Sequence, residues 1–205
     1  MEEAKAHAYV HVPWSPDVFV QLFADAAQKD DATSRLLMQE RDMIERSVHD
    51  VSGRKLQMAE ARRQIVRNSL HPHDTLFEDG KLRAIIDFEE VGMRELLRDV
   101  GHACHRFVRQ YVVHQGKPWQ ETLPRGVKLF LQAYQEENSL LSEELRLMPA
   151  FIIDELLRKV ASAARKISTQ EVPGTYEKEV LKYIDLLKEG DAVGKEIEAF
   201  ADEQA

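Results

Sequence analysis

The sequence predicts a mainly α-helical chain with one small β-hairpin near its middle. From residue 15 to about residue 63, and again from residue 96 onward, apolar residues recur every three or four positions, the spacing that places them on one face of a helix. Between these stretches, two short apolar and β-branched runs flank the dipeptide Asp79-Gly80. This dipeptide favours a tight type I′ turn, which needs positive φ at both central positions. The fold class indicated is therefore α+β, with helices dominant and the strands confined to residues 64–88.

The bulk composition bounds the class of protein. The 205 residues are 43% hydrophobic and 31% charged, as expected of one folded domain rather than a disordered or membrane-spanning chain. The net charge of -8 argues against a nucleic-acid partner, because phosphate binding needs a basic surface. The single cysteine, Cys104, cannot form an internal disulfide, and no secretory signal pattern opens the sequence. We therefore expect a cytoplasmic protein without a membrane partner.

Local signals assign the helices on both sides of the hairpin. Ser15-Pro16-Asp17 predicts the start of the first helix, and the stretch from Leu36 to Ile44 indicates a second. After the hairpin, the pattern predicts a helix with Val100, Cys104, Phe107 and Tyr111 on one face, a helix over Leu123–Tyr134, a helix starting at Ser142, and a last helix over Tyr176–Leu187 stopped by Gly190. The chain is thus read as one domain, 1–205, made of an N-terminal helical part (1–63), a hairpin core (64–99), a helical subdomain (100–190) and a frayed acidic tail (191–205).

Two acids flank the hairpin and suggest a metal site. Asp74 stands in the polar loop that enters the hairpin, and Asp87 ends the returning strand, so antiparallel pairing would bring them together. Two carboxylates facing a solvent gap suit a magnesium-phosphate site, since Mg²⁺ keeps several waters and takes one or two carboxylates. Ordinary solvated acids on a surface hairpin are the other interpretation that the pattern leaves open. With His71 and His73, the same acids could instead hold zinc.

A second histidine pair stands on a predicted helix. His102 and His105 are three positions apart, with Cys104 between them, and such a pair can chelate a metal. No third ligand is apparent in the sequence, and a partly buried helix face is the simpler interpretation.

The loop and the hairpin resemble the catalytic loop of the aminoglycoside phosphotransferase, choline kinase and homoserine kinase family. That family's pattern is His-Gly-Asp-Leu-His-Pro-Gly-Asn, then a strand, a turn, a second strand and Ile-Asp-Phe. This sequence has Arg-Asn-Ser-Leu-His-Pro-His-Asp over residues 67–74 and Ile-Asp-Phe over residues 86–88. Downstream, Arg-Asp-Val-Gly over residues 98–101 resembles the family's Tyr-Asp-Leu-Ala. The resemblance implies a kinase-like carboxy-terminal lobe, ATP and Mg²⁺ as cofactors, and a small-molecule acceptor.

The resemblance also implies a role for each matching residue. Ser69 stands where the family has its catalytic aspartate, and Asp74 stands where it has a magnesium-binding asparagine. Asp87 matches the second metal ligand, whereas His71 and Asp99 match residues that support the loop. A serine hydroxyl has no useful basicity near neutral pH and cannot act as the general base. The catalytic loop is therefore expected to be degenerate.

Two further departures concern charge and the nucleotide. Arg67 replaces the family's first histidine. No Gly-x-Gly occurs, and only Gly53 precedes the hairpin, so the family's nucleotide-binding lobe is expected to be absent. We therefore expect a truncated, degenerate phosphotransferase-like chain without kinase activity on its own. Two alternatives stay open: an active enzyme whose nucleotide lobe comes from another chain, or a non-catalytic module that forms a homodimer or binds a partner.

Overall fold

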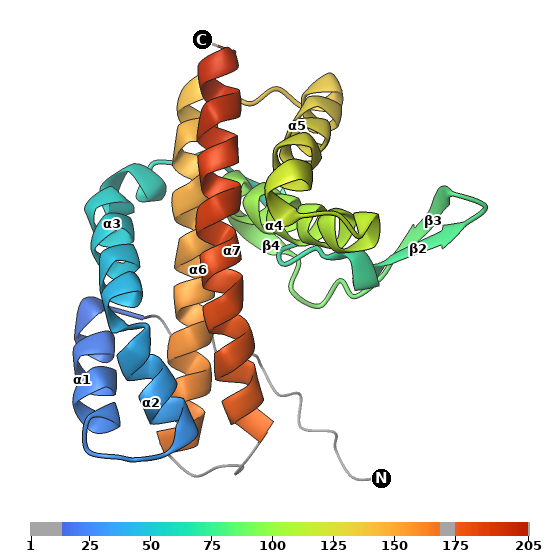
Figure 1. Ribbon diagram of the computed structural model, residues 1–205. Coiled ribbons are helices and arrows are strands. Elements are labelled where there is room, and N and C mark those ends of the chain that lie inside the picture. Colours follow the sequence, from blue (N-terminus) through green and yellow to red (C-terminus); the bar gives the residue numbers. More distant parts are fainter. Residues whose placement is uncertain (1–13, 169–174, 205) are drawn as a thin grey trace, which may run out of the picture.

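The computed structural model describes residues 14–168 and 175–204, and its N-terminal part is helical (Figure 1). The elements of this part are α1 (Pro16–Ala26), α2 (Ala32–Gln39) and α3 (Arg41–Ala59). Ser15 is the N-cap residue of α1 and Pro16 lies in its first turn, as the sequence predicts. Asp31 caps α2 by accepting a hydrogen bond from the Ser34 amide at 2.8 Å. The stretch 36–44, predicted as one helix, spans the end of α2 and the start of α3.

Within the described residues, four short strands form two antiparallel ribbons. The pairs are β1 (Arg63–Val66) with β4 (Gly92–Glu95), and β2 (Thr75–Glu78) with β3 (Lys81–Ile85). The turn between β2 and β3 has Asp79 at φ 51° and Gly80 at φ 72°, so both central residues have the positive φ of a type I′ turn. The predicted hairpin is confirmed. In the sequence, β1 precedes the hairpin and β4 follows it. No local pattern indicated that these two strands pair.

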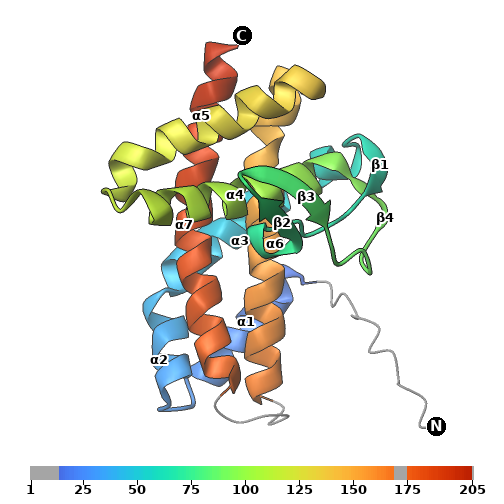
Figure 2. The same ribbon diagram turned by 90° about the vertical axis from the view of Figure 1, so that its right-hand side faces the viewer.

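Two long helices form the axis of the molecule (Figures 1 and 2). The remaining elements are α4 (Leu96–Gln115), α5 (Trp119–Glu137), α6 (Ser142–Ser168) and α7 (Thr175–Glu203). α6 and α7 run antiparallel and side by side, with α1–α3 on one side and α4, α5 and the ribbons on the other. Leu145, Leu157 and Ile184 are fully buried in this arrangement. The predicted class, mainly α with a small hairpin, is confirmed.

The last helix does not stop at Gly190, and that prediction is wrong. α7 continues to Glu203, and Phe200 and Ala201 in its last turns are buried in the core. A Cβ atom added at Gly190 would lie only 2.8 Å from Cδ1 of Leu156. The close approach of α6 and α7 therefore favours glycine here, and the helix does not end at it. The segment expected to fray after residue 191 is helical through Glu203 and packed in the core as far as Ala201.

The first turns of α4 are packed tightly against α6. Val100 and Cys104 are buried, in agreement with the predicted apolar face. A Cβ atom added at Gly101 would lie 3.0 Å from Cγ of Met148. This close contact fixes the start of α4, which carries Asp99, against the helical axis. No helix in the described part of the chain is long and apolar enough to cross a membrane.

Candidate functional site

The loop at residues 67–74 follows β1 and ends in a single 3-10 turn, Pro72–Asp74, directly before the hairpin. Asn68 and Ser69 both have left-handed backbone conformations, with φ of 61° and 59°. Left-handed backbone costs a residue other than glycine roughly 1–2 kcal/mol, so surrounding contacts must hold these two residues in place. Strained backbone of this kind concentrates at functional sites.

Glu90, in the segment after the hairpin, holds the strained residues from one side. Its Oε2 accepts a hydrogen bond from Nδ2 of Asn68 and another from Oγ of Ser69, both at 3.0 Å. The Ser69 hydroxyl is therefore a donor to a carboxylate. The sequence analysis did not identify Glu90, because one acid in a polar segment carries no local signal of this contact.

Asp99, in the first turn of α4, holds the loop from the other side. Its Oδ2 accepts a hydrogen bond from the Arg67 amide at 3.2 Å. Burial raises the pKa of Asp99, while hydrogen bonds from the amides of Arg67, Leu70 and Asn68 act in the opposite direction. The carboxylate thus lies among main-chain donors of the loop. That Asp99 supports the loop stays a prediction, which an unfolding measurement can test.

The guanidinium of Arg67 lies between the two acids that flank the hairpin. Its Nη1 is 2.9 Å from Oδ2 of Asp74, and its Nη2 is 3.4 Å from Oδ2 of Asp87. The same two nitrogens donate to the main-chain oxygens of Asn68 and Ile86 at 3.1 and 3.0 Å. The Arg67 side chain is only 10% exposed. It therefore joins the loop, the end of β3 and both carboxylates.

Asp74 and Asp87 do not face a common solvent gap, contrary to expectation. Asp74 is buried, and its Oδ2 also lies 3.0 Å from both the main-chain nitrogen and Nδ1 of His71. Asp87 is half-exposed, with a left-handed φ of 66°. Its carboxyl group interacts with Glu89, whose pKa is raised by a hydrogen bond to Asp87 and by the charge of Asp87. The two acids thus have different surroundings, and Arg67 contacts both of them.

The other candidate metal ligands are not gathered into a site. The rings of His71 and His73 meet edge to face, with centroids 5.5 Å apart. His102 and His105 are buried on α4, and burial lowers the pKa of both. Cys104 is buried, and its surroundings raise the pKa of the thiol. Over residues 14–168 and 175–204, no three histidine, cysteine or acidic side chains lie together as a metal would need.

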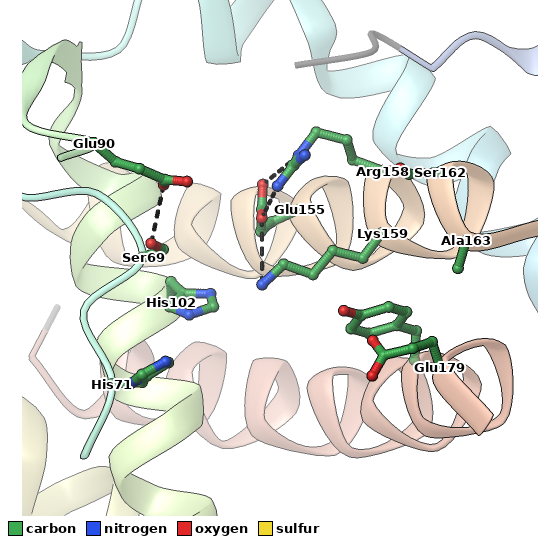
Figure 3. A pocket seen from close by; sticks show the side chains of 11 residues that line it. Ser69, His71, Glu90, His102, Glu155, Arg158, Lys159, Ser162, Ala163 and Glu179 are labelled. Carbon is green, nitrogen blue, oxygen red and sulfur yellow. Dashed lines mark hydrogen bonds and ion pairs between the residues drawn. The ribbon is translucent and has the colours of Figure 1, made fainter. Parts of the chain in front are cut away.

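A cavity of about 220 Å³ opens beside the loop (Figure 3). Ser69, His71 and Glu90 line one wall of the cavity, and residues of α4, α6 and α7 line the others. Ser69 therefore faces a space where a small molecule could lie. None of the helical lining residues except His102 was singled out from the sequence, because the cavity joins helices that are distant along the chain.

Comparison with known proteins adds the family. A family model described as the phosphotransferase enzyme family matches residues 11–136. No curated protein and no solved structure matches the chain. The matched region is more than half of the 205 residues and contains the loop, the hairpin and Asp99. The chain therefore belongs to the phosphotransferase enzyme family.

Proposed function

We propose that the chain is a non-catalytic member of this family, without kinase activity on its own. The observation that carries the proposal is the position of Arg67, whose guanidinium lies between Asp74 and Asp87. The family generally uses ATP and Mg²⁺. The family resemblance implies that Asp74 and Asp87 are metal ligands. In this chain, the positive charge between these two acids comes from Arg67.

The residues present do not fit a magnesium ion held by Asp74 and Asp87. Mg²⁺ needs oxygen ligands at roughly 2.0–2.1 Å in near-octahedral geometry. Asp74 is buried, and its Oδ2 already forms an ion pair with Arg67 and accepts a hydrogen bond from the His71 amide. A guanidinium keeps its charge at any ordinary pH, so deprotonation does not free the carboxylates for a metal. No catalytic step is therefore assigned to a metal at these acids.

The position of the general base supports the same proposal. Ser69 donates its hydroxyl hydrogen to Glu90, and it has no basicity with which to accept a proton from an acceptor hydroxyl. Phosphoryl transfer depends on positioning and on stabilising the charge of the transferred group. With Ser69 at the position of the base and with Arg67 paired to both acids, the loop lacks the groups that would perform the transfer.

We expect the purified chain to show no ATP-dependent phosphorylation of an aminoglycoside, choline or homoserine above background. Ser69→Asp alone should leave the activity at background, because it restores a carboxylate without freeing the metal ligands. We also expect Mg²⁺ to leave the thermal unfolding of the unaltered chain unchanged. Turnover of any of these acceptors by the unaltered chain would overturn the proposal.

Matched variants test the role of Arg67 directly. Arg67→Met keeps the apolar stem and removes the positive charge that competes with Mg²⁺ for Asp74 and Asp87. The variant should then gain about 1.4 kcal/mol of stability when free Mg²⁺ is about tenfold above its Kd. Arg83→Met, at an exposed arginine of the hairpin, is the control and should gain nothing. Equal stabilisation of the unaltered chain by Mg²⁺ would show that Arg67 does not replace the metal.

An interaction module is a second candidate, favoured by the apolar surface of the hairpin. Large apolar side chains that stay exposed there are Leu76, Phe77, Leu82, Ile85, Ile86 and Phe88. A contiguous exposed apolar surface commonly marks a binding face, and an isolated two-stranded hairpin is marginal in water. The same surface could serve a second copy of the chain or a nucleotide-binding lobe on another polypeptide.

If the hairpin surface binds a second copy of the chain, sedimentation should show a concentration-dependent dimer, and Phe77→Lys should abolish this dimer. Phe77 is 61% exposed, and Val113 on α4 is 62% exposed, so Val113→Lys makes a matched control outside the hairpin. A lysine in the centre of an apolar interface is costly to desolvate, which is why only the hairpin variant should dissociate. A monomer at all concentrations would remove the homodimer from consideration.

A further inference from the structure

A larger hollow lies at the end of the molecule where α7 ends (Figure 1). The C-terminal ends of α3 and α7 and the N-terminal end of α6 border a groove of about 960 Å³ there. Neither the loop 67–74 nor the β2–β3 hairpin contributes a residue to its lining, so the groove is separate from the candidate functional site. Its volume lies near the upper end of the range for ligand-binding clefts, roughly 300–1,000 Å³.

Apolar side chains lie in the floor of this groove and at its rim. Leu97, which lines the floor, is fully buried. Leu141 also lines the groove but is 58% exposed, and Leu56, one helical turn from Gly53 of the lining, is 84% exposed. A Cβ atom added at Gly53 would meet no atom within 4 Å, so α3 leaves the groove open at this point. Exposed leucines beside an open groove are typical of a surface that binds a partner.

The charged side chains of the groove leave an excess of negative charge. The lining contains five acids and three arginines, and each arginine is paired with one of the acids. The pairs are Arg54 with Glu198 at 3.7 Å, Arg62 with Glu144 at 3.1 Å, and Arg146 with Asp202 at 2.5 Å. The other two acids, Glu60 and Glu143, are exposed and form no ion pair with any residue that the structure describes. Two carboxylates therefore remain available to a cationic partner.

The ends of the helices add to this negative charge. α3 and α7 both end at the groove, and neither has a basic residue in its last turn. The free carbonyl groups at a helix C-terminus carry partial negative charge and favour a nearby cation. At the opposite kind of end, the first turn of α6, Glu143 and Glu144 already offset the positive pole of the helix. The groove thus favours a positively charged partner over an anionic one.

The lining also indicates which backbone form of a partner fits the groove. No residue of β1, β2, β3 or β4 lines it, so an extended peptide would find no strand edge with which to pair. A helix forms its backbone hydrogen bonds internally and needs no such edge. It can also present apolar side chains on one face and basic side chains beside them, which matches leucines flanked by acids.

We infer that this groove is the docking site for a basic amphipathic helix of a partner protein. The apolar face of that helix covers Leu56 and Leu141, and its lysine or arginine side chains pair with Glu60 and Glu143. The inference concerns a surface other than the hairpin. It does not rest on the proposed loss of kinase activity, because docking here requires neither a nucleotide nor a metal.

Fluorescence anisotropy with labelled peptides tests the inference. The probe is a helix of leucine and lysine about five turns long, with all its leucines on one face, titrated at about 0.15 M salt, where the Debye length is about 8 Å. We expect this peptide to bind, and a peptide of the same composition without a common leucine face to bind at least tenfold more weakly. A leucine and glutamate helix and spermine should not bind measurably. No binding of the first peptide, or equal binding of the reordered peptide or of spermine, would overturn the inference.

Four variants of the chain connect this binding to the groove. Leu56→Gln should weaken binding of the leucine and lysine helix at least tenfold, whereas Val20→Gln, at a 67% exposed position on α1, should leave it unchanged. Glu60→Lys should also weaken binding tenfold, and a lysine at the end of α3 suits the helix dipole, so the fold is not at risk. Asp185→Lys makes the same change of charge at an exposed position on α7 outside the groove and should have no effect. Unchanged affinity in Leu56→Gln would place the peptide elsewhere and contradict the inference.

Sedimentation distinguishes a partner protein from a second copy of the chain. A dimer of the unaltered chain that Leu56→Gln dissociates would make a second copy the occupant of the groove, and the inferred basic partner would be wrong. ATP-dependent turnover, in contrast, would overturn only the proposed function, since the peptide titrations contain no nucleotide.

Discussion

Replacing Asp99 by alanine is expected to lower the free energy of unfolding by about 2 to 4 kcal/mol. Its Oδ2 accepts from the Arg67 amide at 3.2 Å, and the amides of Asn68 and Leu70 also act on the carboxyl group. These donors belong to the loop beside the start of α4, in which Asn68 is buried. Each buried donor left without an acceptor costs roughly 1 to 3 kcal/mol. Urea or thermal unfolding of Asp99→Ala measures the loss.

The control for Asp99→Ala is Asp87→Ala. Asp87 is half-exposed, faces the negative charge of Glu89, and shares Arg67 with Asp74, so its removal should be close to neutral. A loss below about 1 kcal/mol for Asp99→Ala would indicate only the favourable interaction of an acid with the N-terminus of α4. The loop would then be held by Glu90 and Arg67 alone.

Lowering the pH from 7.5 to 5.5 should remove about 2 to 3 kcal/mol of stability through His102 and His105. Both are buried; the pKa of His105 is lowered from 6.5 to about 3, chiefly by burial and then by Arg106, and that of His102 is also lowered by burial. A base whose folded pKa is depressed stabilises the fold above its unfolded pKa, and this stability is lost as the pH falls. Below about pH 6.5 the unfolded chain binds protons that the folded chain cannot, and each histidine then contributes a loss of roughly 1 kcal/mol over this interval.

The carboxylate nearest to His105 does not cancel this effect. Oε2 of Glu189 lies 3.9 Å from Nε2 of His105, but it is already paired with Arg109 at 2.7 Å. His105→Leu should therefore flatten the pH dependence by about half, as seen in denaturant unfolding at several pH values. His49→Gln is the matched control, because His49 is 89% exposed. A pH dependence unchanged in His105→Leu would show that this ring becomes protonated without unfolding.

The sequence by itself determined the elements whose signals are local. Ser15 and Pro16 mark the start of α1 because capping and the fixed φ of proline act within one turn. Asp79 and Gly80 determine the hairpin because a type I′ turn depends on two residues alone. The loop motif identified the family for the same reason, since its residues are consecutive in the chain and can be compared one by one.

Only the tertiary structure decided which contacts form between residues that are distant in the sequence. Gly190 resembles a helix stop in the sequence, yet the close approach of Leu156 makes it a contact between α6 and α7. Arg67 resembles a simple replacement, yet the return of β3 places it between two carboxylates. Glu90 has no sequence signal at all, yet it holds the loop. Packing, charge pairing and desolvation depend on which segments meet in space, and a local pattern carries no information about that meeting.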